Sequence, residues 1–540
     1  MNEDVKASGE VILKKPVKSA GKMSLAERIR KLFLPVILYI RSYIESGRID
    51  IDILYMVTYM NSIATSNISR DEIFKKVSER EEYACSKYMK EVYLLAKNWN
   101  YEYGVACNLV AKKVANKKLK DLLMRLSNAM TSGESEKKFL ENEWQTMLLI
   151  YKNEYERSLE SLKKWTDAYT ALLVSLSFIS ITVLLSLVIY NIGDKYTTII
   201  ATIIVVILVS GAGVFILRSE SPKEYRTHKM LICSPEQQLI KNMQRILLPI
   251  AVFVTGLMVL LGIDLGIIMV LIGLILIPMG LIGIKDDKNI FTRDRDFSEF
   301  TKMLGTIIGS MGVTVKEGIT KVDRKSIKSL EPLVKRLYVQ LFMGIDPRLC
   351  WTRFVGNSGS ELINKFTHVF IDAIDMGGDA TKIGRFVNTT SLEVVLLRMK
   401  RNLLSSSFIN LLIPMHAAMV GLVIFVIQIM IIFSGIISNL YSTMDMGIGG
   451  DMGGEGAIIG SLGFNLFQDV PTALFTQYCI ALVIILTIAN TLAAKYVDGG
   501  DNYKVYYYGS LMCIISGICY IVVPIIVNMI FSFEGLQGGL

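Results

Sequence analysis

Seven long apolar stretches constrain this chain more than any other feature of its sequence. They cover residues 170–192, 197–217, 246–262, 265–284, 408–437, 472–494 and 506–531. A helix needs about 20 apolar residues to cross a hydrocarbon core about 30 Å thick, and each stretch is close to that length or exceeds it. The sequence therefore predicts an all-α, polytopic membrane protein with about seven transmembrane helices.

The composition shows that the rest of the chain is polar. Hydrophobic residues make up 52% of the 540 residues and charged residues 20%, so the spans must alternate with soluble segments. The net charge of +9 is modest, and no basic stretch is interleaved with aromatic residues, so nucleic-acid binding is not indicated. The seven cysteines form no C-x-x-C pair, and neither a zinc site nor a disulfide framework is predicted.

Lys and Arg mark the predicted cytoplasmic side of the membrane. They are frequent in segments 218–245 and 285–401, whereas the acidic, Gly-rich loop 438–470 contains neither. Lys195, in a short outer turn, is the one exception to this alternation. We therefore expect the N-terminus and both large soluble segments to be cytoplasmic, and the Gly-rich loop and the C-terminus to be external.

The two large soluble segments resemble each other when the sequence is compared with itself at one fixed offset. At this shift Glu72 lies over Glu317, Lys76 over Lys321, Val77 over Val322, and Gly133-Glu134 over Gly378-Asp379. Single matches are weak, but their shared register indicates an internal duplication. Apolar residues three and four apart predict that both copies are helical bundles. Each copy ends in a long helix, 135–170 or 379–408, that continues into a span.

These features divide the chain into five regions. Residues 1–49 form a basic N-terminal tail and an amphipathic lead-in, 50–169 a first cytoplasmic helical domain, 170–284 four transmembrane helices with a basic loop, 285–407 a second cytoplasmic helical domain, and 408–540 three transmembrane helices with an acidic, Gly-rich external loop. Because each domain continues into a span, displacement of a domain is expected to reach the membrane.

No motif predicts an enzyme, a cofactor site or a metal site. The sequence has no phosphate-binding loop and no G-x-S-x-G, and its three histidines are far apart. His416 follows Pro414 by two residues inside a span. An intramembrane histidine can be functional, but a histidine that reaches the nearby interface is the simpler interpretation. Gly305 and Gly309 are expected to allow close helix packing.

Basic residues outside the spans are the candidate partner-binding residues. A charged surface can simply be solvated, but a large domain without a catalytic motif is expected to act by binding. Cations could dock an acidic partner or anionic lipid headgroups. The candidates are Lys223, Arg226, Lys229, Lys316, Lys321, Arg324, Lys325, Lys328, Lys335, Arg336, Arg398, Lys400 and Arg401.

Two helical domains, each running into a span and each with a G-[DE] turn before its last long helix, resemble the type II secretion F-domain family. Segment 297–437 carries the resemblance most clearly, above all D-M-G-G-D at 375–379. Thr381 and Lys382 stand where bacterial members usually have a further Gly. The chain is therefore more similar to the archaeal branch, which forms the membrane platform of the archaellum. The resemblance covers roughly residues 50–531.

The resemblance implies a function and partners. Members of the archaeal branch anchor a filament base in the cell membrane and bind a hexameric cytoplasmic ATPase. They pass its motion to archaellin or pilin-like subunits, and in the archaellum they also support rotation. A homodimer in contact with membrane lipids is expected, with no cofactor and no nucleic-acid partner.

Two other protein classes remain open. A transporter or channel predicts polar groups along a path through the membrane and short cytoplasmic loops. No span has a charged residue near its middle, and the cytoplasmic segments are long. A receptor predicts a sizeable external sensing domain, whereas the longest external segment is the loop 438–470. The sequence favours a non-enzymatic assembly platform.

Overall fold

The chain is helical over nearly all residues that its computed structural model describes, which are 47, 49–190, 195–447 and 472–531. These ranges contain no β-strand, and one isolated bridge pairs Thr227 with Ser360. The all-α prediction is confirmed. The predicted basic tail, most of the Gly-rich loop and the C-terminal tail after residue 531 lie outside the described residues.

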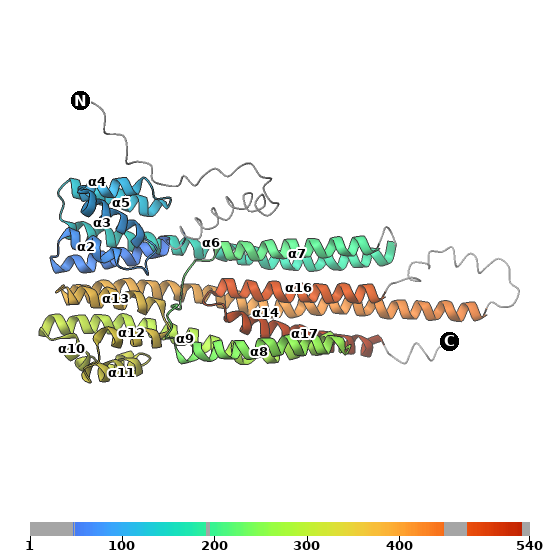
Figure 1. Cartoon of the computed structure of the whole chain (residues 1–540). Coiled ribbons are helices and arrows are strands. Elements are labelled where there is room, and N and C mark those ends of the chain that lie inside the picture. The colour runs from blue at the N-terminus through green and yellow to red at the C-terminus, as the bar shows by residue number, and fades with distance from the viewer. Residues whose placement is uncertain (1–46, 48, 191–194, 448–471, 532–540) are drawn as a thin grey trace, which may run out of the picture.

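Seven helices are long and apolar enough to cross a membrane, as the sequence predicted. They are α6 (Glu136–Tyr190), α7 (Lys195–Glu220), α8 (Pro235–Leu260), α9 (Leu265–Met311), α14 (Ala380–Gly447), α16 (Thr472–Asp498) and α17 (Lys504–Phe531). Their apolar parts run side by side at one end of an elongated molecule. The two helical domains form the other end (Figure 1). The chain is therefore a multi-pass membrane protein.

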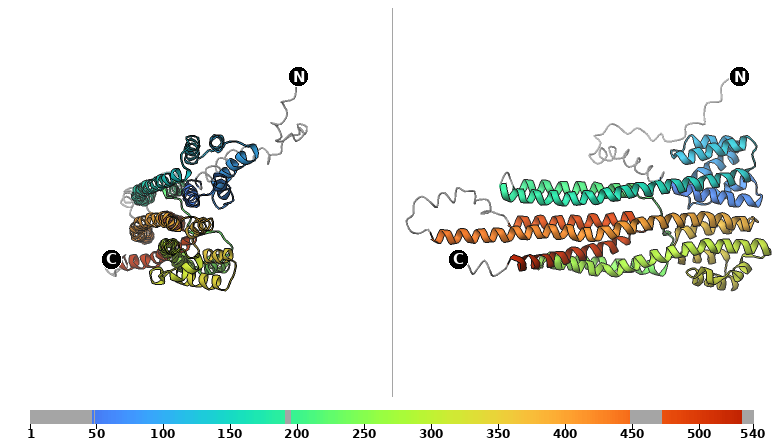
Figure 2. Two further views of the ribbon diagram at one scale, coloured as in Figure 1. Left: turned by 90° about the vertical axis from the view of Figure 1, so that its left-hand side faces the viewer. Right: turned by 180° about the vertical axis from the view of Figure 1, so that it is seen from behind.

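The long helices are arranged in three layers: α6 with α7, α14 with α16, and α17 with α9 and α8 (Figure 2). A glycine stripe brings α9 against α17. A Cβ added at Gly266, Gly273 or Gly280 would lie 2.5 to 2.8 Å from atoms of α17, so only glycine permits this approach. Small residues serve in this way at helix contacts in membranes.

Each helical domain consists of short helices and ends with the start of a long helix that continues into a span. The first contains a helix over residues 49–63, η1 (Ala64–Ser66), α2 (Arg70–Ser78), α3 (Ser86–Trp99), α4 (Tyr103–Ala111), α5 (Lys117–Thr131) and the start of α6. The second contains the end of α9, α10 (Val315–Lys321), η2 (Arg324–Ile327), α11 (Glu331–Phe342), α12 (Pro347–Ser358), α13 (Glu361–Asp375) and the start of α14.

The helices of the two domains recur in the predicted register. When Glu317 is aligned with Glu72, α10 begins at the position of α2, and α11 begins at the position of α3. The residues before α2 and α10 have equivalent roles. Asn67 and Gly312 are both left-handed, and the Ser69 and Thr314 hydroxyls each accept a hydrogen bond from the backbone N–H three residues later. A hydroxyl at this position satisfies a helix N–H that has no partner inside the helix.

The register shifts by one position in the later helices. Relative to α5 and α6, the helices α13 and α14 each begin one position earlier than the alignment of the first helices requires. The predicted pairing of Gly133 with Gly378 is therefore wrong by one position. The left-handed glycine before the last helix is Gly133 (φ 73°) in the first domain and Gly377 (φ 79°) in the second.

The two domains share one hydrophobic core. Tyr55 packs on Phe366 of α13 with ring centroids 5.1 Å apart, and Trp144 of α6 packs on Phe386 of α14 at 4.9 Å. The Trp144 indole N–H donates a hydrogen bond of 2.9 Å to Thr390. Two ion pairs, Asp52–Lys365 and Arg80–Asp372, cross the same contact. The domains are thus held together by packing and by paired charges.

Candidate functional site

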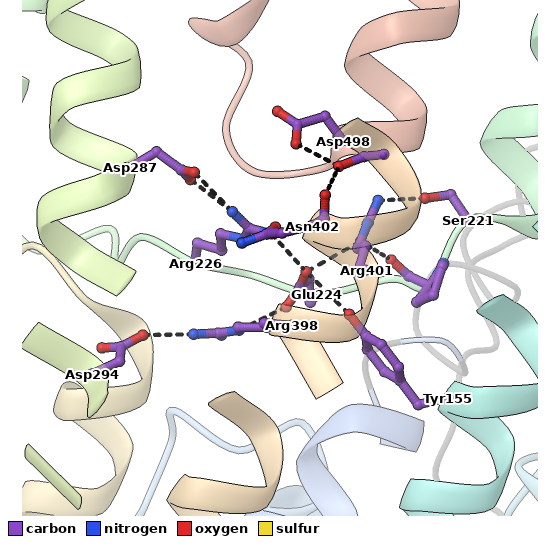
Figure 3. Close-up of polar contacts among 12 residues, drawn as sticks. Tyr155, Ser221, Glu224, Arg226, Asp287, Asp294, Arg398, Arg401, Asn402 and Asp498 are labelled. Carbon is purple, nitrogen blue, oxygen red and sulfur yellow. Dashed lines mark hydrogen bonds and ion pairs between the residues drawn. The ribbon is translucent and has the colours of Figure 1, made fainter. Parts of the chain in front are cut away.

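The polar contacts at the base of the helical domains form the most extensive buried charge cluster described in the molecule (Figure 3). They lie where the loop between α7 and α8, residues 221–234, crosses α9 and α14. We call the following residues the junction network: Glu224, Arg226, Asp287, Asp294, Arg398, Arg401, Asp498 and Lys504.

Glu224 is the centre of the junction network. Its side chain is 5% exposed and accepts hydrogen bonds from Arg398 Nε at 2.7 Å and from Arg401 Nη1 at 3.1 Å. Burial alone would raise the pKa of Glu224, but the charges of Arg226, Arg398 and Arg401 outweigh it and hold the pKa well below its usual range. Glu224 therefore stays ionised although it is buried.

Arg398 connects the loop to α9. Its guanidinium donates from Nη1 to Asp294 at 2.6 Å and from Nε to Glu224, so it lies between two carboxylates (Figure 3). Arg226 similarly donates to Asp287 at 2.8 Å. Burial raises the pKa of Asp294 to about 6, and the charge of Arg398 opposes this rise.

Arg401 connects α14 to the loop and to the end of α16. Its guanidinium donates to the carbonyl oxygens of Pro222 at 2.8 Å, Tyr496 at 3.0 Å and Val497 at 3.2 Å. Next to it Gly499 has φ 75°, and a Cβ there would lie 2.4 Å from Arg401 Cζ. Glycine is therefore the residue that lets the α16–α17 turn close over the guanidinium.

The charges of the junction network balance, with four cations and four carboxylates. Lys504 of α17 lies 2.7 Å from both Asp287 and Asp498. Buried ions are tolerated when they are paired and hydrogen-bonded, and removal of one partner typically costs about 3–5 kcal/mol. The network thus fixes the loop, α9, α14, α16 and α17 relative to one another.

Three of the candidate partner-binding residues are corrected by this geometry. Arg226, Arg398 and Arg401 are only 3%, 2% and 2% exposed. Their charges are satisfied inside the molecule, so they cannot dock a partner. Their carboxylate partners are distant in sequence; Glu224, for example, lies 174 residues before Arg398. A basic residue beside a span looks the same in sequence whether it is buried or solvated.

Lys223, Lys229 and Lys400 remain at the surface near the junction. Lys400 forms an ion pair of 2.5 Å with Glu156 of α6, and its side chain is 54% exposed. It thus faces outward two residues from the buried Arg398. Lys223 and Lys229 lie in the loop between α7 and α8.

The other seven candidates lie together on α10, η2 and α11 of the second domain. We call this set the basic surface: Lys316, Lys321, Arg324, Lys325, Lys328, Lys335 and Arg336. All are exposed except Arg324, which is half-buried beneath the Tyr338 ring. None of them forms an ion pair with a described residue, so their charges are available to a partner.

His416 does not reach the interface, and that expectation is wrong. It is 0% exposed, with Nε2 2.8 Å from Ser516 Oγ and Nδ1 2.9 Å from Asn490 Nδ2. Tyr169 donates to the Asn490 side chain at 3.1 Å. The histidine thus joins α6, α14, α16 and α17 through neutral hydrogen bonds, and its polar partners remove the need to reach water.

The expected role of two glycines is confirmed. A Cβ at Gly305 would lie 2.5 Å from the Ala380 carbonyl oxygen, and one at Gly309 would lie 2.1 Å from Thr381 Oγ1. The end of α9 therefore packs directly on the start of α14. Among the described residues, no group of three or more His, Cys, Asp or Glu side chains could hold a metal ion.

Two curated proteins are similar to the chain over most of its length. The flagella accessory protein J of Methanocaldococcus jannaschii is 23% identical over 497 residues, which cover 87% of this chain and 85% of the relative. The protein of the same name from Methanococcus voltae is 20% identical over 530 residues, covering 94% and 91%. No family model and no solved structure matches the chain. The chain is thus similar to flagella accessory protein J of these two organisms over most of its length, and this similarity supports an assignment to the archaellum.

Proposed function

We propose that the chain is a non-enzymatic membrane platform for the assembly, and the rotation, of an archaellum or a related pilus-like filament. The observation that carries this proposal is the junction network, which locks α9 and α14, the two long helices of the second domain, to α16, α17 and the loop after α7 at the level where the spans begin. The names of the two relatives support a role in an archaeal flagellum. We further propose that the platform couples an ATPase to the filament subunits.

Continuous helices give the platform its mechanical path. α6 has 55 residues, α9 has 47 and α14 has 68, and each passes from a helical domain into a span without a break. At about 1.5 Å per residue, α14 is about 100 Å long. Sliding of one such helix past another would separate buried charges in the junction network. A force on the domains is therefore transmitted to the spans.

In this proposal both domains are cytoplasmic and the basic surface receives a hexameric ATPase, while the spans contact archaellin or pilin-like subunits. The positive-inside distribution of Lys and Arg supports the orientation. Labelling of cysteines placed at Lys76 and Lys316 tests it. Both sites should react only from the cytoplasm, and labelling from opposite sides would contradict the platform.

A transporter or channel is the alternative function, and the packing of the spans favours the platform. The cavity among Ser180, Val423, Tyr478 and Leu482 of α6, α14 and α16 has a volume of about 10 Å³. This volume holds one water at most, so that part of the bundle offers no substrate site.

Charge reversal tests the proposed ATPase contact. Replacement of Lys316, Lys321, Lys325 and Lys328 by Glu should weaken ATPase binding in a pull-down from reconstituted membranes, because the docking field changes sign. Membrane insertion should be unchanged. The matched control reverses four exposed lysines of the first domain, Lys112, Lys113, Lys117 and Lys120, and should leave binding intact. Equal ATPase recovery from both variants would reject the basic surface as the contact.

A further inference from the structure

α8 is the span that the rest of the protein covers least. Only 6% of its most apolar stretch is buried inside the molecule, whereas the other six spans have 28% to 50% of theirs buried. Val252, Phe253 and Leu260 are 73%, 71% and 86% exposed. α8 lies at the edge of the bundle, in the layer that it shares with α9 and α17 (Figure 2). Since the helix is long and apolar enough to cross a membrane, this surface contacts lipid chains.

The lipid-facing surface of α8 ends in two cations. Val259 and Val252 are both exposed and lie seven residues apart, and Arg245 lies a further seven residues before Val252. Lys241 lies four residues before Arg245, and both cations are exposed. Residues spaced by seven or by four lie on one face of a helix. The face of α8 that meets lipid chains therefore continues into Arg245 and Lys241.

α9 repeats this arrangement in the opposite chain direction. Leu274 and Leu281 are 55% and 56% exposed and lie seven residues apart. Lys285 and Lys288 follow Leu281 by four and by seven residues, and both are exposed. The lipid-facing stripe of α9 thus also ends in two cations. Because α8 and α9 form a hairpin, the four cations gather at the end of the hairpin that faces the helical domains.

The lengths of the two helices place these cations at the membrane surface. Leu261, where α8 ends, is 20 residues after Lys241, and Leu265, where α9 begins, is 20 residues before Lys285. At about 1.5 Å per residue both distances are about 30 Å, which is the thickness of a hydrocarbon core. With the hairpin turn at one surface, both lysines lie at the other. Arg245 is about one turn deeper, and its long side chain can extend to the headgroups.

The carboxylates at this end of the hairpin face the protein interior. Residues 285–288 read K-D-D-K and are neutral in sequence. Asp286 is 0% exposed and accepts a hydrogen bond of 2.9 Å from Ser234, and Asp287 accepts one of 2.8 Å from Arg226. Both aspartates are therefore turned inward while the two lysines are turned outward. The fold separates the charges that the sequence places together.

The outward cations have no carboxylate partner among the described residues. Glu236, the one acidic residue of α8, accepts a hydrogen bond of 3.0 Å from Asn289 of α9. Lys241 Nζ lies 3.6 Å from Cys233 Sγ, and no ion pair joins any of the four cations to a described residue. Four positive charges thus face the headgroup region without internal neutralisation.

The opposite edge of the bundle differs in its charge. On α6, Lys163 and Lys164 are exposed just before the span, but Glu160 and Asp167 are exposed as well. Glu160 lies four residues before Lys164, and Asp167 four residues after Lys163, so the opposite charges are neighbours on the helix. That edge is locally neutral. An unbalanced set of surface cations is therefore a property of the α8–α9 hairpin and does not follow from closeness to a span.

We propose that Lys241, Arg245, Lys285 and Lys288, which we call the lipid collar, bind the headgroups of anionic phospholipids. Cations at the membrane surface attract anionic lipids, whereas a zwitterionic headgroup brings its own cation. Headgroups bound by the lipid collar hold the hairpin at a fixed depth. α9 also carries Asp287 and Asp294 of the junction network, so the same lipids set the depth of the network. This inference rests on the chain spanning a membrane and is independent of the proposed function.

The test measures which lipid lies beside the lipid collar, with the full chain in phosphatidylcholine nanodiscs. A fluorophore is attached through Ile246→Cys in a cysteine-free chain, since Ile246 is 62% exposed and follows Arg245. Spin-labelled phosphatidylglycerol or phosphatidylcholine is added in a small fraction as the quencher. We expect phosphatidylglycerol to be enriched at least about tenfold beside the fluorophore at low salt, because each cation contributes a factor on the order of five. The enrichment should fall as salt is added.

Three variants separate charge from other causes of enrichment. The combination of Lys241→Gln, Arg245→Gln, Lys285→Gln and Lys288→Gln should bring the enrichment to about one. Replacement of the three lysines by Arg should preserve it, since the charges remain. Lys163→Gln with Lys164→Gln on α6 is the matched control and should also preserve it. Circular dichroism and size-exclusion chromatography verify that each variant is folded.

Two results would overturn the lipid collar. One is equal quenching by both lipids beside the unmodified chain, and the other is an enrichment that survives the four glutamine substitutions. Loss of the enrichment in the arginine variant would show that charge is not its cause and would overturn the proposal as well. None of these outcomes bears on the platform function, which is tested by recovery of the ATPase.

Discussion

The first helix of each repeat has opposite surroundings in the two domains. Residues 52–64 of the first domain are all buried, wedged against the second domain. The equivalent part of α9 keeps Glu299, Lys302 and Thr306 exposed. The duplicated helix therefore serves as an interdomain wedge in one copy and as a solvated surface in the other. A repeat can keep its helix boundaries while one face changes from charged to apolar.

The largest effect on stability is expected when the buried apolar residue and the exposed charged residue at one equivalent position are exchanged. Val57 is 0% exposed, and its equivalent Lys302 is exposed. Val57→Lys buries an unpaired charge in the shared core and should lower the free energy of unfolding by about 4 kcal/mol or more. Lys302→Val, at the equivalent solvated position, should change it by less than about 0.5 kcal/mol. Thermal unfolding of the purified chain measures both, and equal effects would reject the wedge.

The second prediction compares a buried with an exposed cation on the same helix. Arg398→Met leaves Glu224 and Asp294 without their shared partner and should cost about 3–5 kcal/mol of stability. Lys400→Met removes only a surface ion pair with Glu156 and should cost about 0–1 kcal/mol. Both side chains lose a charge and keep an apolar stem, so the difference reports burial. Denaturant titration in detergent gives the two values.

The interdomain hydrogen bond gives a smaller effect. Trp144→Phe keeps an aromatic ring against Phe386 but removes the donor to Thr390, and should destabilise the chain by about 1–2 kcal/mol. Thr390→Val in the same background should add little, because the two residues share one bond. A double-mutant cycle of unfolding free energies tests this, and full additivity would show that the bond contributes nothing.

The smallest effect concerns the equivalent left-handed residues Asn67 and Gly312. Gly312→Ala should destabilise the second domain by about 1 kcal/mol, because a side chain with a Cβ disfavours φ 62°. Gly312→Asn should cost less, since Asn67 holds φ 53° in the first domain. Thermal unfolding measures the stability of both variants. A larger loss of stability for Gly312→Asn than for Gly312→Ala would show that the turns at Asn67 and Gly312 are not equivalent.

The spans and the duplication could be predicted from the sequence because their signals are local. About 20 apolar residues in a row indicate a span wherever they occur. The change in register by one position was missed because one glycine follows another at Gly377-Gly378, and only backbone torsions show which is left-handed.

The junction network could not be predicted, because its pairs join distant segments. Nothing near Arg398 in sequence indicates Glu224 or Asp294, and a cation beside a span also fits the positive-inside pattern. His416 was placed at the interface for the same reason, since Asn490 and Ser516 lie on other helices.

The central claim is that the helical domains and the spans move as one body through the junction network. Spin labels at Lys335 of the second domain and Ile525 of α17, in a cysteine-free chain in nanodiscs, test it by electron–electron distance measurement. We expect one narrow distance distribution that broadens when Arg398 is replaced by Met. A broad or two-peaked distribution with the network intact would contradict the account.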